Sequence, residues 1–138
     1  HRHPTKVVAS AASLISSVRS LYSDYEDELR SGKEQAEVWS ECFNRFLDSR
    51  KRLNKEDQII DLRFEDFVKD QMATVKNIYD RFGWDLSEEA QTRMKKFLKQ
   101  NPKDKHGAHN YTLEKFGLTE KGIERQYSKY INFLNQLD

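Results

Sequence analysis

Apolar residues recur every three or four positions over most of the chain, and this spacing predicts helices that each bury one face. The first predicted helix starts at Pro4, because proline suits the first helical position, where its missing N–H costs nothing. Its expected buried positions are Val7, Val8, Ala11, Leu14, Ile15, Val18, Tyr22 and Tyr25. A polar connection around Ser31-Gly32 is expected to separate it from a second helix. The expected buried positions of that helix are Ala36, Trp39, Cys42, Phe43, Phe46, Leu47 and Leu53.

Three further helices are predicted in the second half of the chain. The third is expected to bury Val68, Met72, Val75, Ile78, Tyr79 and Phe82. Gly83 is expected to end it, because glycine readily adopts the left-handed conformation that follows a helix. Ser87, with Glu88 and Glu89 behind it, is a typical N-cap for the fourth helix. The last helix is expected to begin at Thr119 and to bury Ile123, Tyr127, Tyr130, Ile131 and Leu134.

A short apolar run from Gln58 to Arg63 lacks helical spacing, and it predicts one interior strand, with a possible second strand ending at His1-Arg2. A buried strand needs paired neighbours for its backbone groups. Five helices with one or two strands therefore indicate an α/β protein, whose helices cover a parallel sheet that lies mostly outside these 138 residues. We expect residues 1–138 to form a single partial domain and to be a fragment.

Composition narrows the function classes. The net charge is +1, so no global basic field favours nucleic acid as a partner. The chain has no apolar run near the roughly 20 residues that a membrane span needs. Its single cysteine, Cys42, cannot form an internal disulfide, which favours a reducing, cytoplasmic location. No cluster of Cys and His has metal-site spacing, so we expect no metal.

The first candidate for chemistry is the start of the first helix. Arg2 precedes it directly, and Ser10 follows Arg2 by eight positions. A helix N-terminus presents free N–H groups and partial positive charge, and a guanidinium adds a two-pronged donor for phosphate oxygens. The segment thus predicts a local anion site. The alternative interpretation, a surface arginine and an ordinary helix serine, stays open.

The second candidate is Phe64, just after the predicted strand, where ligands of open α/β sheets bind. Its ring could pack on a base, or it could be a core residue with Glu65-Asp66 capping the next helix. The third candidate is the loop around Lys105, His106 and Gly107, which suits phosphate, although a plain solvated loop is equally open. A metal bound between His106 and His109 is a weaker interpretation, since no third ligand is evident.

Four segments, in this order, resemble the C-terminal half of bacterial-type sulfotransferases that use 3'-phosphoadenosine 5'-phosphosulfate (PAPS). They are Arg2-His3-Pro4 with Val7-Val8-Ala9-Ser10, Asp61-Leu62-Arg63-Phe64-Glu65-Asp66, Ile78-Tyr79-Asp80-Arg81-Phe82-Gly83, and Lys105-His106-Gly107-Ala108-His109-Asn110-Tyr111 with Phe116-Gly117-Leu118. The resemblance implies a P-loop-like parallel-sheet fold. It also implies transfer of a sulfuryl group from PAPS to a hydroxyl or amine of a small-molecule, carbohydrate or lipid acceptor.

The same resemblance implies specific roles. Arg2 and Ser10 would hold the 3'-phosphate, Phe64 would pack near the adenine in place of the family's usual Tyr, and Lys105, His106 and Gly107 would contact phosphate. The phosphosulfate loop with its lysine, and the catalytic base, are implied to lie upstream of Arg2. The chain alone is therefore expected to be inactive.

Two other functions stay open from sequence. One is a relative of the nucleotide kinases, although no glycine-rich phosphate loop is present. The other is a non-enzymatic helical interaction module. If the predicted strand from Ile59 to Leu62 has an exposed edge, it is also a potential site of self-association.

Overall fold

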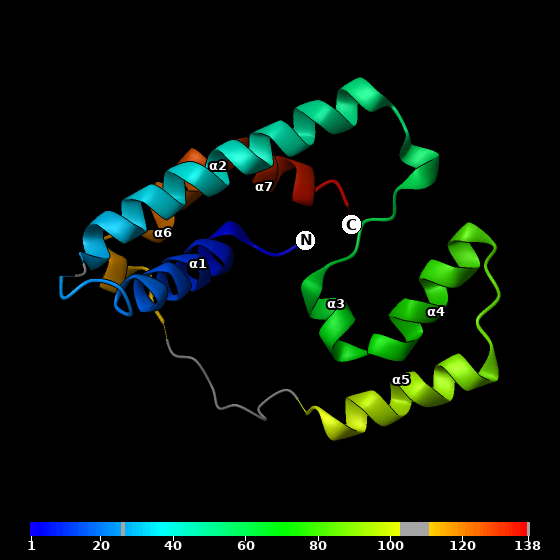
Figure 1. Cartoon of the computed structure of the whole chain (residues 1–138). Coiled ribbons are helices and arrows are strands. Elements are labelled where there is room, and N and C mark those ends of the chain that lie inside the picture. The colour runs from blue at the N-terminus through cyan, green and yellow to red at the C-terminus, as the bar shows by residue number, and fades with distance from the viewer. Residues whose placement is uncertain (26, 103–110, 138) are drawn as a thin grey trace. The chain divides into compact units, whose positions relative to one another are not determined.

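The computed structural model describes residues 1–25, 27–102 and 111–137 (Figure 1). Its elements are α1 (Pro4–Arg19), α2 (Glu28–Leu53), the 3-10 turn η1 (Glu56–Gln58), α3 (Phe64–Lys69), α4 (Gln71–Phe82), α5 (Glu88–Gln100), the 3-10 turn η2 (Glu114–Phe116), α6 (Glu120–Gln126) and α7 (Ser128–Leu134). The chain divides into two compact units. Unit 1 comprises residue 1 with residues 55–109, and unit 2 comprises residues 2–54 with 110–138. The prediction of a single partial domain stays a prediction.

Small side chains join α1 to α2 in unit 2. Val8, Ala9 and Ala12 of α1 are buried, as are Gly32 and Ala36 of α2. The predicted buried face of α1 is therefore wrong in part, because Leu14, Val18, Tyr22 and Tyr25 are exposed. The predicted connection at Ser31-Gly32 is also wrong, because Ser31 and Gly32 lie buried inside α2. The helix starts earlier, where the Asp27 side chain caps it by accepting from the Arg30 amide at 3.0 Å.

The C-terminal segment completes the core of unit 2. Leu113, Ile123 and Tyr127 are buried with Val8, Ala9 and Ala36. The hydroxyl of Tyr127 donates to the Ala36 carbonyl at 2.6 Å, and the Gln126 side chain donates to the same oxygen at 3.1 Å. The predicted last helix begins at its Thr119 cap as expected, but it is divided at Tyr127 into α6 and α7.

An aromatic row runs along α2 and α7. Phe43 stacks on Tyr130, with ring centroids 4.0 Å apart, and meets Tyr127 edge-on at 5.9 Å. Phe46 contacts Phe133 at 6.0 Å in the same edge-to-face manner. These rings explain why the aromatic positions predicted for α2 and for the last helix share one surface.

Unit 1 consists of η1, α3, α4 and α5 in its described part. Asp70 caps α4 through the Ala73 amide, Ser87 caps α5 through the Ala90 amide, and Gly83 ends α4 with φ of 65°. The Ser87 and Gly83 predictions are thus confirmed. No residue of the described part of unit 1, residues 1 and 55–102, is fully buried. The apolar positions predicted for α4, such as Val75 and Ile78, are half-buried.

The predicted strand from Gln58 to Arg63 is wrong for the described residues, which contain no assigned strand. Gln58 ends η1, and residues 59–63 carry no regular structure, with Ile59 in an extended conformation. One feature of a parallel pair is nevertheless present: the His1 backbone N–H donates to the Leu62 carbonyl, and the Phe64 N–H donates to the His1 carbonyl at 2.7 Å. A single bridge of this kind does not make a strand, so the strand ending at His1-Arg2 is not found either.

Candidate anion site at the start of α1

No side chain caps the N-terminus of α1 with a hydrogen bond. His3 occupies the N-cap in an extended conformation, and its carbonyl accepts from the Lys6 and Val7 amides at 3.0 and 3.2 Å. Its side chain makes no capping hydrogen bond, and the first turn contains no acidic residue. Most helices place a carboxylate or hydroxyl at this end. Here the positive end of a 16-residue helix has no carboxylate and no side-chain cap, which favours an external anion.

Arg2 directly precedes α1, whereas Ser10 lies near the middle of the helix. Both belong to unit 2, and both are half-buried. Ser10 follows Pro4 by six helical positions, or about 9 Å along the axis. Spacings of three, four and seven residues place His3, Lys6 and Ser10 on one face of the helix. Arg2 is thus at the helix start and Ser10 about two turns further along, and their phosphate-binding role stays a prediction.

A pocket of about 230 Å³ borders the same helix start. Thr5, Lys6 and Ala9 line one side, and the segment from Tyr111 to Glu114 lines the other, with Glu120. Thr5 is buried, and its hydroxyl is hydrogen bonded to Nδ1 of His3 at 2.8 Å. The pocket is lined by one lysine and two glutamates, so it carries no net positive charge. The main cationic partner of an anion bound at this helix start would therefore be Arg2.

Phe64 is the first residue of α3 in unit 1 and is 40% exposed. It is therefore not a core residue in the described structure. Glu65 and Asp66 occupy the first turn of α3, where they interact favourably with the helix dipole without a side-chain cap. A pocket of about 540 Å³ near this turn includes Arg63 and Phe67 in its lining. The remaining candidates, Lys105, His106 and Gly107, fall outside the described residues.

Sequence reasoning missed a charged cluster that joins α1 to α2. Arg19 donates to the buried Ser31 hydroxyl at 2.8 Å and to Glu34 at 2.6 Å, and Arg30 donates to the same carboxylate at 2.7 Å. Hydrogen bonds from Arg19 and then Arg30 lower the pKa of Glu34. The four-residue spacing of Arg30 and Glu34 signals half of this cluster. No neighbouring residue in the sequence predicts that Arg19 belongs to this cluster.

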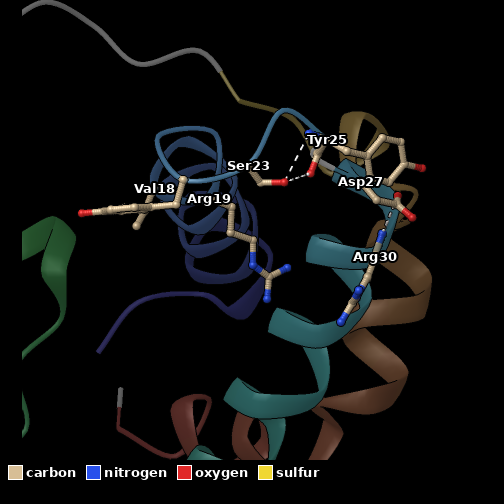
Figure 2. A pocket seen from close by; sticks show the side chains of 7 residues that line it. Val18, Arg19, Ser23, Tyr25, Asp27 and Arg30 are labelled. Carbon is tan, nitrogen blue, oxygen red and sulfur yellow. Dashed lines mark hydrogen bonds between the residues drawn. The ribbon is translucent and has the colours of Figure 1, made fainter.

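This cluster borders a pocket of about 410 Å³, shown in Figure 2. Its lining residues are Val18, Arg19, Tyr22, Ser23, Tyr25, Asp27 and Arg30. Both guanidinium groups at the pocket are already hydrogen bonded to Glu34, whose carboxylate would compete with an incoming anion. These pairings weigh against this pocket as an anion site.

Among residues 1–25, 27–102 and 111–137, no three His, Cys, Asp or Glu side chains are grouped so that they could hold a metal ion. None of the helices in that part of the chain has the length and apolar character needed to cross a membrane.

The structure is similar to part of a sulfotransferase fold. A solved structure of sulfotransferase STF9 from Mycobacterium avium matches 96% of this chain with a TM-score of 0.83 and 23% sequence identity. The match covers 34% of that protein, so this chain spans about a third of the length of its structural relative. A comparison with curated proteins gives no match.

A match to a family model identifies the family of this chain. The model described as "Sulfotransferase family" matches residues 1–88, well over half of the chain, and includes Arg2, Ser10 and Phe64. This protein therefore belongs to the sulfotransferase family, as the resemblance in its sequence indicated.

Proposed function

We propose that this chain forms the part of a PAPS-dependent sulfotransferase that holds the 3'-phosphate and adenosine of the nucleotide. In this proposal the Arg2 guanidinium and the Ser10 hydroxyl donate hydrogen bonds to the 3'-phosphate. The free N–H groups at the start of α1 add the positive end of the helix dipole. Charge-assisted bonds of this kind are the strongest that a protein offers a phosphate.

One observation carries the proposal: the N-terminal turn of α1 has no acidic residue and no side-chain cap, although Arg2 precedes it directly. An arginine beside a helix start without a side-chain cap adds a guanidinium to the positive end of the helix dipole. The half-buried state of Arg2 and Ser10 supports this further, because partial exclusion of water strengthens hydrogen bonds to a charged group. These features fit a phosphate.

The other contacts of the nucleotide are proposed on the family resemblance. Phe64 would pack its ring against the adenine, and Lys105, His106 and Gly107 would contact phosphate. The chain that carries the last three continues into Tyr111, which lines the pocket beside Thr5 and Lys6.

The reaction proposed for the whole protein is transfer of a sulfuryl group to a hydroxyl or amine of a small-molecule, carbohydrate or lipid acceptor. PAPS would supply the sulfuryl group, and the residues described above would bind and orient its nucleotide. Fixed cations at a transferring group stabilise the charge that develops there, as in phosphoryl transfer. Within this chain, Arg2 is proposed to bind the 3'-phosphate, which does not react, and so to orient the donor for transfer.

The proposal is tested by isothermal titration calorimetry of the chain with adenosine 3',5'-bisphosphate and with adenosine 5'-monophosphate. We expect tighter binding of the 3'-phosphorylated nucleotide. Arg2→Ala or Ser10→Ala should weaken that binding roughly tenfold to a hundredfold, since a hydrogen bond to a charged group contributes about 1.5–3 kcal/mol. Neither variant should change the weaker binding of the monophosphate.

Two variants serve as matched controls. Arg45→Ala removes an exposed arginine that pairs with Glu41 on α2, and Ser17→Ala removes an exposed α1 serine that donates to the Ser13 carbonyl. Both should bind the bisphosphate as the original chain does. Equal affinity for the two nucleotides, unaltered by Arg2→Ala and Ser10→Ala, would reject the clamp and favour a helical interaction module.

A further inference from the structure

A further pocket of unit 2 lies between the second half of α1, the start of α2 and the η2 turn. Its volume is about 300 Å³, which is within the range of small-ligand pockets. It shares no lining residue with the three pockets described above. Its lining consists of four serines at the end of α1 with one acidic, one basic and one aromatic residue: Ser13, Ser16, Ser17, Ser20, Glu28, Lys115 and Phe116.

The four serines form one hydroxyl-bearing face. Their spacings of three and four residues place them side by side along the helix. The Ser17 hydroxyl donates to the Ser13 carbonyl at 2.9 Å, and the Ser20 hydroxyl donates to the Ser17 carbonyl at 2.8 Å. Bonds of this kind to the preceding turn are common for serine in helices. They use the hydroxyl protons of Ser17 and Ser20 and leave the oxygens as acceptors.

Ser16 differs from its neighbours. It is 8% exposed, and its hydroxyl forms no hydrogen bond within the part of the chain that the structure describes. A buried polar group without a partner normally costs stability, because it has lost its hydrogen bonds to water. Since Ser16 lines the pocket, a molecule bound there can supply the missing partner. The Ser16 hydroxyl can both donate to that molecule and accept from it.

The charges at the pocket cancel. Nζ of Lys115 lies 2.9 Å from Oε1 of Glu28, so the two groups form an ion pair at the pocket. An anion would meet the Glu28 carboxylate as well as the Lys115 ammonium, and a cation would meet the same pair with the signs reversed. Phe116 is 1% exposed, so its ring offers almost no apolar surface to a ligand. The pocket therefore favours a neutral molecule that is rich in hydrogen-bonding groups.

The walls of the pocket are held in place by close packing. Gly32 of α2 approaches η2 so closely that a Cβ atom there would lie 2.2 Å from the carbonyl oxygen of Phe116. The ion pair of Lys115 and Glu28 joins the same two elements. A site whose walls are already fixed loses little freedom when a ligand binds, which favours its affinity.

We propose that this pocket binds one ring of a neutral carbohydrate. Each sugar hydroxyl can donate and accept at once, which matches the accepting oxygens of Ser17 and Ser20 and the unpartnered hydroxyl of Ser16. The proposal concerns binding in this pocket and does not depend on the nucleotide clamp, because neither Arg2 nor Ser10 lines the pocket.

The test is a titration of the ¹⁵N-labelled chain, without nucleotide, followed by two-dimensional NMR. The probes are methyl α-D-glucopyranoside, methyl α-D-mannopyranoside and methyl β-D-galactopyranoside. At least one should shift the amide signals of Ser16 and Lys115 in a saturable manner. Ser16→Ala should weaken its binding roughly threefold to tenfold, as expected for one neutral hydrogen bond. Ser13→Ala, at a half-buried position of the same face, should also weaken it.

Ser49→Ala is the matched control, because Ser49 is a half-buried helical serine of α2 that does not line the pocket. It should bind the sugar as the original chain does, and circular dichroism confirms that each variant is folded. The proposal is overturned if none of the three glycosides shifts these signals, since the pocket would then hold solvent only. It is also overturned if Ser16→Ala and Ser13→Ala both bind like Ser49→Ala, or if sodium phosphate saturates the same signals more tightly than any glycoside.

Discussion

Replacing Gly32 with alanine tests how α2 and the η2 turn fit together. A Cβ atom at Gly32 would lie 2.2 Å from the carbonyl oxygen of Phe116, 2.7 Å from its Cβ and 3.0 Å from its carbonyl carbon. These are backbone or backbone-adjacent atoms, so no change of rotamer relieves the overlap. Either α2 or η2 must move.

The expected loss follows from three effects. Alanine in place of glycine inside a helix gains about 1 kcal/mol of intrinsic propensity. Overpacking of a close contact costs about 1–3 kcal/mol. Movement of η2 also exposes part of Phe116, a ring that is 1% exposed and whose full burial contributes up to about 3 kcal/mol. The net result is a free energy of unfolding lower by about 2 kcal/mol.

Urea unfolding followed by far-UV circular dichroism measures this loss. Gly122→Ala is the matched control, because Gly122 is also helical but its Cβ would meet the Thr119 hydroxyl, at 3.0 Å, which is an exposed side chain. That variant should stay within about 1 kcal/mol of the original protein. If Gly32→Ala is as stable as Gly122→Ala, the close approach of η2 to α2 is wrong.

Two further predictions concern ionisable groups in unit 2. Burial raises the pKa of the Tyr127 phenol, so the neutral form is favoured in the folded protein and the free energy of unfolding should fall as pH rises above about 10. Tyr127→Phe should abolish this alkaline loss. Near neutral pH the same variant should lose about 1 kcal/mol of stability, because its hydrogen bond to the Ala36 carbonyl is absent. An unchanged alkaline limb in Tyr127→Phe would contradict this. Hydrogen bonds from Arg19 lower the pKa of Glu34, so the stability that the Glu34 carboxylate contributes is present above its ordinary pKa and is lost as pH falls. Arg19→Ala should raise the pKa of Glu34 toward its ordinary value, which NMR titration of the carboxyl carbon measures. A Glu34 titration that is the same in both proteins would exclude the interaction.

Local signals predicted the helix ends well. Pro4 starts α1, Ser87 caps α5, Thr119 caps α6 and Gly83 ends α4, as expected. Each of these depends on one residue and its immediate neighbours, such as a side-chain oxygen that accepts from an amide three positions later. Such signals require no knowledge of the rest of the protein.

The buried face of α1 was harder to predict because the helix has two apolar faces. Periodicity favours the face with the larger side chains, and it selected Leu14 and Val18. The structure instead buries the smaller Ala9 and Ala12, and Ala9 shares a core cluster with Ala36 of α2. Shape decides the partner here, and hydrophobicity alone does not contain that information.

The strand prediction at residues 58–63 failed for a physical reason. A strand exists only through hydrogen bonds to neighbours, and the described part of the chain offers this segment one parallel bridge, to His1. The extended conformation at Ile59 persists without assigned pairing.

The candidate site, like the fold, has a part that the local sequence predicts and a part that it does not. The uncapped start of α1 with Arg2 and Ser10 is encoded within ten consecutive residues, so sequence alone identified it. The Arg19 cluster depends on contact between two helices, and sequence missed it. A phosphate site that needs only one helix end and one flanking arginine is also largely preformed, since its donors are held by local backbone geometry. Nucleotide selectivity for the 3'-phosphate should therefore be measurable on this chain alone.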